Sequence, residues 1–183
     1  MLRPVFHGFL GRLVRDRRGV SAVEFALIAP TMILLYLALT EFSQVYMAER
    51  RAGHAASMMT DLVAQSATAT AAGIDQTFGI GEVIMRPFSS DQLSMRVSSL
   101  TMKPGGKITV DWSRNNNNKL TRLSEVKEIP PNLIAPNESL IMGEISYRYR
   151  LSIGEKLIDR EFVLERKYYL RPRTVNTVTC ADC

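Results

Sequence analysis

The sequence has little of the chemistry that catalysis requires. It contains two histidines, His7 and His54, and no serine or cysteine motif accompanies either of them. Its glycines fit neither the GxGxxG nor the GxxxxGKS spacing of phosphate-binding loops, and no carboxylate cluster has the spacing of a calcium loop. No unit of about 20 to 50 residues repeats, which excludes solenoids and propellers. The sequence therefore argues against an enzyme and indicates no cofactor.

Cysteine is also scarce. The two cysteines, Cys180 and Cys183, lie at the C-terminal end in the string TCADC. A CxxC redox motif normally opens a helix within a βαβ pattern, and a zinc site needs further ligands, which the two distant histidines do not supply. A domain exported from the cytoplasm meets an oxidising compartment, so we predict a disulfide here and no metal site.

Charge is almost missing from one long segment. Residues 20–40 contain a single formal charge, Glu24, and they would span about 31 Å as a helix, which matches the hydrocarbon thickness of a bilayer. A carboxylate inside such a span costs about 2.5 to 3.5 kcal/mol on insertion scales, so it usually has a partner or a task. Pro30 removes one hydrogen bond of this helix and should kink it.

Positive charge is concentrated before this segment. Residues 1–19 carry a net charge of +4, so only +1 of the total of +5 remains for the rest of the chain. Because positively charged flanks stay in the cytoplasm, we predict a single pass through the membrane with a cytoplasmic N-terminus and a C-terminal domain on the outer side. The leader of 19 residues is either a short basic amphipathic helix on the membrane face or a segment without fixed structure.

The helical period continues past the apolar run. An apolar stripe extends to about residue 65, where an unbroken helix from Val20 would reach about 70 Å, and a run rich in alanine, serine and threonine then dilutes it. We assign residues 20–40 to a transmembrane helix, residues 41–73 to an amphipathic extension that finishes in a helix end or hinge, and residues 74–183 to an external domain.

In the external domain the apolar residues first recur with the period of a helix and then with the period of two that is typical of strands. Residues 75–88 indicate a short helix, although two glycines weaken it. Residues 92–102 and 107–113 alternate as a hairpin around a Pro-Gly-Gly turn, with Ile108, Val110 and Trp112 on one face. Residues 139–151 and 160–170 form a second antiparallel pair. We therefore predict an α+β fold, in which a long N-terminal membrane-spanning helix continues into a domain with an antiparallel sheet of about four strands.

Basic and aromatic residues interleave near the C-terminus, a pattern that can bind nucleic acid or anionic partners. On alternating strands the simpler interpretation is one solvated face with amphipathic tyrosines, and we expect no nucleic-acid partner. The members are Tyr147, Arg148, Tyr149, Arg150, Arg166, Lys167, Tyr168, Tyr169, Arg171 and Arg173.

The string GVSAVEF, residues 19–25, has the residue types of a peptidase cleavage site. Gly19 precedes Val20, and Glu24 followed by Phe25 stands four residues later, which resembles the substrate site of prepilin peptidases. Cleavage after Gly19 would expose the Val20 amine, one helical turn from Glu24 on the same face. Gly19 and Val20 are thus the predicted cleavage site, and Glu24 with Phe25 the predicted assembly contact.

The wider string from Arg18 to Pro30, RGVSAVEFALIAP, is similar to the N-terminal signature of the TadE-like family, which includes the pseudopilins TadE and TadF of the tight-adherence (Flp-type) pilus. The WSR string at 112–114, a late tyrosine-rich strand and the RPR string at 171–173 agree in outline. In this family the glutamate is expected to meet the terminal amine of an adjacent subunit.

The resemblance implies a minor pilin or pseudopilin that is cut by a prepilin peptidase and acts in pilus assembly, initiation or capping. It also implies a single-pass protein of the bacterial inner membrane whose C-terminal domain is periplasmic. Its partners would be that peptidase, other pilins or pseudopilins, the assembly platform and the membrane. At 183 residues the chain is far longer than a major Flp pilin, so it is not expected to be the bulk subunit. Two alternatives stay open: a signal-anchored periplasmic interaction or sensor domain without peptidase processing, and a secreted protein cut by signal peptidase near residues 52–57.

Overall fold

The computed structural model describes residues 19–116, 120–121, 123–124, 126, 129–130, 133–151 and 161–183. Several sequence predictions lie outside these residues, among them the leader with its arginines and the turn between the last two long strands. The described chain forms two compact units that divide between Ser43 and Gln44.

A single helix, α2 (Val20–Gln65), runs from the first unit into the second. Its 46 residues continue through Pro30. The apolar residues of the first unit remain exposed; Phe25 and Leu27, for example, are each 72% accessible. This exposure is expected of a helix whose apolar side chains are covered by lipid instead of protein.

The second unit contains a four-stranded antiparallel sheet in the order β3-β2-β4-β5. Its strands are β2 (Leu93–Met102), β3 (Ile108–Asn115), β4 (Ser139–Arg150) and β5 (Glu161–Leu170). The β2–β3 turn contains Gly105 and Gly106, both at positive φ, where glycine is the least strained residue. The predicted α+β class and its four-stranded sheet are therefore confirmed.

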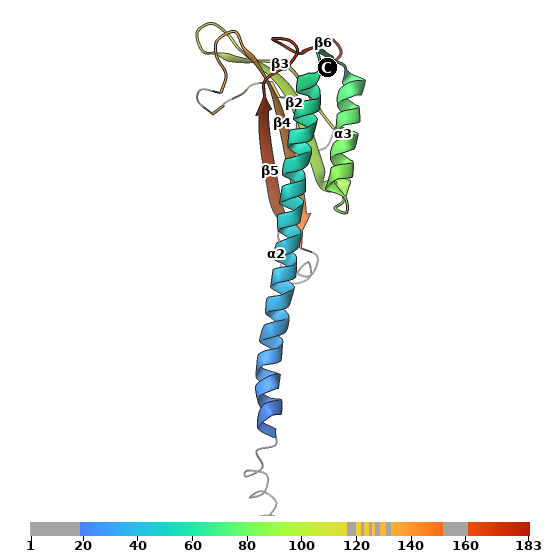
Figure 1. Cartoon of the computed structure of the whole chain (residues 1–183), viewed down its shortest axis with the longest axis vertical. Coiled ribbons are helices and arrows are strands. Elements are labelled where there is room, and N and C mark those ends of the chain that lie inside the picture. The colour runs from blue at the N-terminus through green and yellow to red at the C-terminus, as the bar shows by residue number, and fades with distance from the viewer. Residues whose placement is uncertain are drawn as a thin grey trace, which may run out of the picture. The chain divides into compact units, whose positions relative to one another are not determined.

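The C-terminal part of α2 and the helix α3 (Ala71–Met85) lie over one face of this sheet (Figure 1). The side of α2 that meets the sheet is rich in alanine, and the fully buried residues include Ala48, Ala52, Ala55 and Ala56. Small side chains let the helix backbone approach the strands closely. The space between helix and sheet is filled by larger residues, which include Met59, Ile74, Phe78, Met95 and Ile145.

The prediction that Ile108, Val110 and Trp112 share one face of β3 is wrong. Val110 pairs with Leu100, whereas Trp112 pairs with Ser99, so Asp111 is an extra residue in a β-bulge. Because neighbouring residues of a strand point to opposite faces, the bulge turns Trp112 to the helix-covered face and leaves Val110 on the other. Asp111 accepts hydrogen bonds from the hydroxyls of Ser99 (3.1 Å) and Thr101 (2.6 Å).

α2 ends at Gln65, inside the run of residues 64–73 in which the sequence predicted a helix end or hinge. The last carbonyls of a helix need outside donors, and the C-terminal segment provides them: Arg173 N donates to the Ala64 carbonyl at 2.9 Å. The chain then forms β1 (Thr68–Ala69), which pairs in parallel with β6 (Thr179–Cys180). Nothing local in the sequence signals a pairing between segments so far apart.

The opposite face of the sheet holds a buried ionic cluster. Arg96 Nε donates to Glu144 Oε2 at 2.6 Å, and Lys167 Nζ lies 3.2 Å from Glu144 Oε1. The Glu144 side chain is only 6% exposed, so its charge depends on these two cations.

Candidate functional site: the N-terminal helix and the C-terminal clamp

The predicted cleavage site lies at the beginning of α2. Val20 is the first residue of this helix, and Gly19 stands directly before it. Both residues are exposed, and a Cβ at position 19 would meet open space. Hydrolysis of the Gly19–Val20 bond would therefore leave Val20 at the end of an intact helix.

Glu24 lies one turn further along α2 and is also exposed, as is Phe25. Within the described residues, no cation forms an ion pair with Glu24. The structure therefore places Val20 and Glu24 one turn apart on the same helix.

The apolar stretch that contains Glu24 is the membrane candidate. In the described part of the chain, α2 is the one helix long and apolar enough to cross a membrane, and none of its apolar 18-residue stretch is buried by protein.

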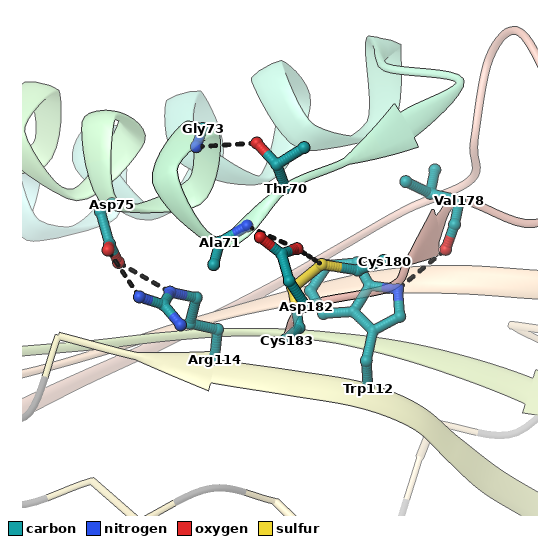
Figure 2. The surroundings of a disulfide bond; sticks show 10 residues. All are labelled: Thr70, Ala71, Gly73, Asp75, Trp112, Arg114, Val178, Cys180, Asp182 and Cys183. Atoms are coloured by element: carbon teal, nitrogen blue, oxygen red, sulfur yellow. Dashed lines mark hydrogen bonds and ion pairs between the residues drawn. A yellow bond between two sulfur atoms is a disulfide. The ribbon is translucent and has the colours of Figure 1, made fainter.

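In the second unit, residues 173–183 form a structure that we term the C-terminal clamp (Figure 2). Its two cysteines, Cys180 and Cys183, are joined by a disulfide. Between them, Asp182 Oδ1 accepts a hydrogen bond from the backbone N–H of Ala71, the first residue of α3, at 2.9 Å. A carboxylate at this position offsets the partial positive charge of the helix N-terminus.

One further contact holds the clamp against the sheet, and a side chain next to it caps α3. Trp112 Nε1 donates to the Val178 carbonyl at 2.8 Å, and Val178 is fully buried. Thr70 caps α3 by accepting from Gly73 N at 3.1 Å. Sequence reasoning missed these roles, although Thr70 before an alanine run carries the ordinary signal of a helix N-cap.

α3 is also tied to β3 by an ion pair. Arg114 Nε and Nη2 donate to the two carboxylate oxygens of Asp75 at 2.8 and 2.6 Å. These hydrogen bonds lower the pKa of Asp75, against a smaller opposing effect of burial. The arginine of the WSR string is therefore a positioning residue for α3.

The basic and aromatic residues near the C-terminus do not form one solvated face, contrary to the simpler interpretation of the sequence. Tyr147 and Tyr149 are buried on the helix-covered face, whereas Arg148 is half-buried and Arg150 is exposed on the other face. Most of the cations are paired with acidic residues: Arg150 with Glu161, Arg166 with Glu49, Lys167 with Glu144, Arg171 with Glu138 and Arg173 with Asp61. This local pairing leaves little positive charge for nucleic acid.

One group of potential metal ligands occurs among the described residues, and it consists of Cys180, Asp182 and Cys183. Both sulfurs belong to the disulfide, so neither is available as a thiolate ligand. His54 lies away from this group on α2, and His7 is outside the described residues.

Comparison with known families gives one match, and it lies in the part of the chain that contains most of α2. A family model described as TadE-like protein matches residues 19–61. The chain carries a TadE-like region. The match begins at Gly19 and covers the apolar segment with Glu24, which confirms the resemblance seen in the sequence. No curated protein and no solved structure matches the chain.

The TadE-like family has a known general character. TadE-like proteins are pilus components and not an enzyme family. In this chain the match covers residues 19–61, which contain the apolar stretch of α2 that is long enough to cross a membrane.

Proposed function

We propose that the protein is a minor pilin or pseudopilin of a tight-adherence pilus, cut after Gly19 and active in assembly, initiation or capping of the fibre. The observation that carries this proposal is that the TadE-like match starts at Gly19, directly before the first residue of α2. Its partners would be a prepilin peptidase, other pilins or pseudopilins and the assembly platform. The site residues serve as a substrate and an assembly contact.

The cleavage step is a hydrolysis. Water adds its hydroxyl to the Gly19 carbonyl carbon, the bond from that carbon to Val20 N breaks, and the released amine takes up a proton. In lipid this cation and the Glu24 carboxylate would each be costly alone, so pairing between adjacent subunits favours assembly. Before cleavage the amine does not exist, which makes assembly depend on processing.

The mature N-terminus tests the first half of the proposal. In cells with an active prepilin peptidase, mass spectrometry of the membrane-extracted protein should find Val20 as the first residue. Gly19→Leu should leave the chain uncut, because a bulky side chain replaces the glycine at the scissile bond. An intact Met1 or Leu2 terminus in the unmodified protein would instead favour a signal-anchored interaction or sensor domain.

Glu24 tests the second half. We expect Glu24→Ala and Glu24→Gln to be cut normally but to fail in incorporation, because neither side chain offers a charge to the amine. Ser21→Ala is a matched control on the same helix end and should behave as the unmodified protein. Normal pili in cells that carry only Glu24→Gln would refute the pairing role.

Orientation needs its own measurement. We expect protease added to spheroplasts to degrade the domain that contains the sheet, because it would lie on the periplasmic side of the inner membrane. Protection of this domain until the membrane is lysed would reverse the proposed orientation.

A further inference from the structure

A pocket in the second unit opens where β4 continues beyond the beginning of β2. Leu93, the first residue of β2, pairs with Tyr147, so the strand from Arg148 onward is not paired with β2. The pocket has a volume of about 400 Å³, and the rings of Phe88, Tyr147 and Tyr149 line it. Phe88 lies edge-on to both tyrosines, with ring centroids 6.2 Å apart in each pair. We term this cavity the β4-end pocket.

The charges of the β4-end pocket suit an anion. Arg148 and Arg150 line it, and none of the described residues that line it is acidic. Arg150 donates to Glu161 of β5 at 2.8 Å, whereas Arg148 is half-buried and makes no ion pair with a described residue. A half-buried cation attracts an anion more strongly than a fully solvated one, because less water screens the two charges.

Uncharged hydrogen-bond donors stand beside these arginines. Gln44, Ser89 and Gln92 also line the pocket. Burial raises the pKa of Tyr147, so its hydroxyl stays protonated at neutral pH and can donate. The Ser89 hydroxyl is already shared, because it donates to Asp91 at 3.1 Å. A guanidinium with neighbouring amide and hydroxyl donors matches the several acceptor oxygens of a phosphate group.

The place of the pocket along α2 indicates the source of such a phosphate. Gln44 follows Thr40, the last residue of the apolar run, by four residues, which is a rise of about 6 Å along the helix. The headgroup layer on each side of a bilayer is about 5 to 7 Å thick beyond the hydrocarbon core. A helix that leaves the hydrocarbon at Thr40 therefore carries Gln44 into the headgroup layer, where tyrosine and arginine side chains are favoured.

We propose that the β4-end pocket binds the phosphate headgroup of an anionic phospholipid from the membrane in which α2 is anchored. Arg148 pairs with the phosphate, Gln44 and Gln92 donate to its oxygens, and the aromatic rings contact the carbon atoms of the headgroup. This contact gives the domain a second attachment to the membrane besides α2. The inference rests on the proposed membrane anchoring.

A photo-reactive amino acid at Ser89 of the full chain tests the contact. The protein is placed in nanodiscs of phosphatidylcholine with a minor share of phosphatidylglycerol, and mass spectrometry distinguishes the adducts of the two lipids. One arginine near an anionic membrane surface contributes a factor of about five, so phosphatidylglycerol adducts should exceed the share of that lipid about fivefold. Adducts in proportion to the share, or no lipid adducts, would overturn the proposal.

Charge changes in the pocket identify the residues that bind. We expect Arg148→Gln and Gln44→Glu each to reduce the phosphatidylglycerol adducts to the share of the lipid, because one removes the cation and the other adds a carboxylate of nearly the same size. Arg50→Gln is the matched control and should keep the enrichment, since Arg50 is an exposed arginine of α2 that does not line the pocket. The fluorescence of the buried Trp112 should remain that of the folded domain in every variant. An equal loss in Arg50→Gln would indicate general attraction to anionic lipid and no specific pocket.

Inorganic phosphate separates the lipid from a soluble anion. We expect an excess of it to leave the enrichment within about twofold, because the bilayer holds the lipid beside the pocket at a high effective concentration. Loss of the phosphatidylglycerol adducts in phosphate would assign the pocket to a soluble anion and contradict the headgroup contact.

The N-terminus of the same samples, made in cells with an active prepilin peptidase, separates this inference from the proposed function. Protein cut before Val20 that shows no lipid enrichment contradicts the headgroup contact alone. Protein that keeps its leader but enriches phosphatidylglycerol contradicts peptidase processing and supports the headgroup contact.

Discussion

Gly143 of β4 lies directly beneath Thr60 of α2, with no room for a side chain between them. A Cβ at position 143 would meet Thr60 Oγ1 in steric overlap and would lie 3.3 Å from the carbonyl oxygen of Ala56. Thr60 is fully buried, and its hydroxyl donates to that same carbonyl at 2.6 Å. The glycine therefore sets how closely the helix approaches the sheet.

We expect Gly143→Ala to lower the free energy of unfolding by about 1 to 3 kcal/mol, because the added methyl group overpacks the interface between helix and sheet. Thermal unfolding in detergent, followed by the fluorescence of the single tryptophan, measures the change. Thr60→Ala should recover part of the loss in the double variant, since it removes the nearest atom but leaves the helix backbone in place.

Gly79 provides the contrasting prediction. It lies within α3, and a Cβ there would meet no atom within 4 Å. Gly79→Ala should therefore stabilise the protein by about 0.4 to 1 kcal/mol, because alanine loses less backbone entropy on forming a helix. A loss of stability in this variant would mean that position 79 has a contact absent from the described chain.

The sequence predicted the helices and strands whose pattern of apolar residues can be read within the element itself. The apolar run and its stripe defined α2, and two alternating pairs defined the four-stranded sheet. Gly19 and Glu24 were proposed as site residues because their spacing is a linear motif, and the family match begins at Gly19.

The features that were not predicted depend on contacts between distant segments. The bulge at Asp111 changes the face of Trp112, and no residue pattern in β3 announces it. The contacts of the C-terminal clamp also join distant segments: Arg173 N donates to the Ala64 carbonyl at the end of α2, and Asp182 reaches α3 across more than one hundred residues of sequence.

Trp112 links the sheet to the clamp, which leads to a third stability prediction. Trp112→Phe keeps an aromatic ring but removes the N–H that binds the buried Val178 carbonyl. We expect a loss of about 1 to 3 kcal/mol, because an unsatisfied carbonyl stays buried and the smaller ring leaves a gap. Circular dichroism at 222 nm should follow this variant, since its fluorescence probe is gone. Unfolding that matches the unmodified protein would show that water replaces the lost donor.

The ion pair of Asp75 and Arg114 predicts a dependence of stability on pH. The pKa of Asp75 is lowered in the folded state, so the pair stabilises the fold at pH values above the unfolded pKa of about 3.9 and loses this effect as the pH falls through the folded pKa. The Asp75 side chain is 49% exposed, so solvent screening limits the effect to about 0.2 to 1 kcal/mol. Asp75→Asn should be less stable than the unmodified protein at pH 7. The difference should vanish in strong acid, and a constant difference at all pH values would contradict this origin.

The disulfide and Asp182 give the last prediction. The bond between Cys180 and Cys183 closes a ring of four residues that presents the Asp182 carboxylate to the N-terminus of α3. Loop-closure entropy assigns such a small ring up to about 2 kcal/mol, and loss of a capping side chain costs about 0.5 to 2 kcal/mol. We expect Asp182→Ala and the paired change of both cysteines to serine each to lower the free energy of unfolding.

If the ring acts by positioning Asp182, the losses in these variants are not additive. Once the ring is open, Asp182 is no longer held at Ala71 N, so Asp182→Ala should then cost little more. Hydrogen exchange at the Ala71 amide gives a local measurement, and it should accelerate in both single changes. Additive losses, with slow exchange at Ala71 in the open ring, would show that Asp182 finds the helix end without the disulfide.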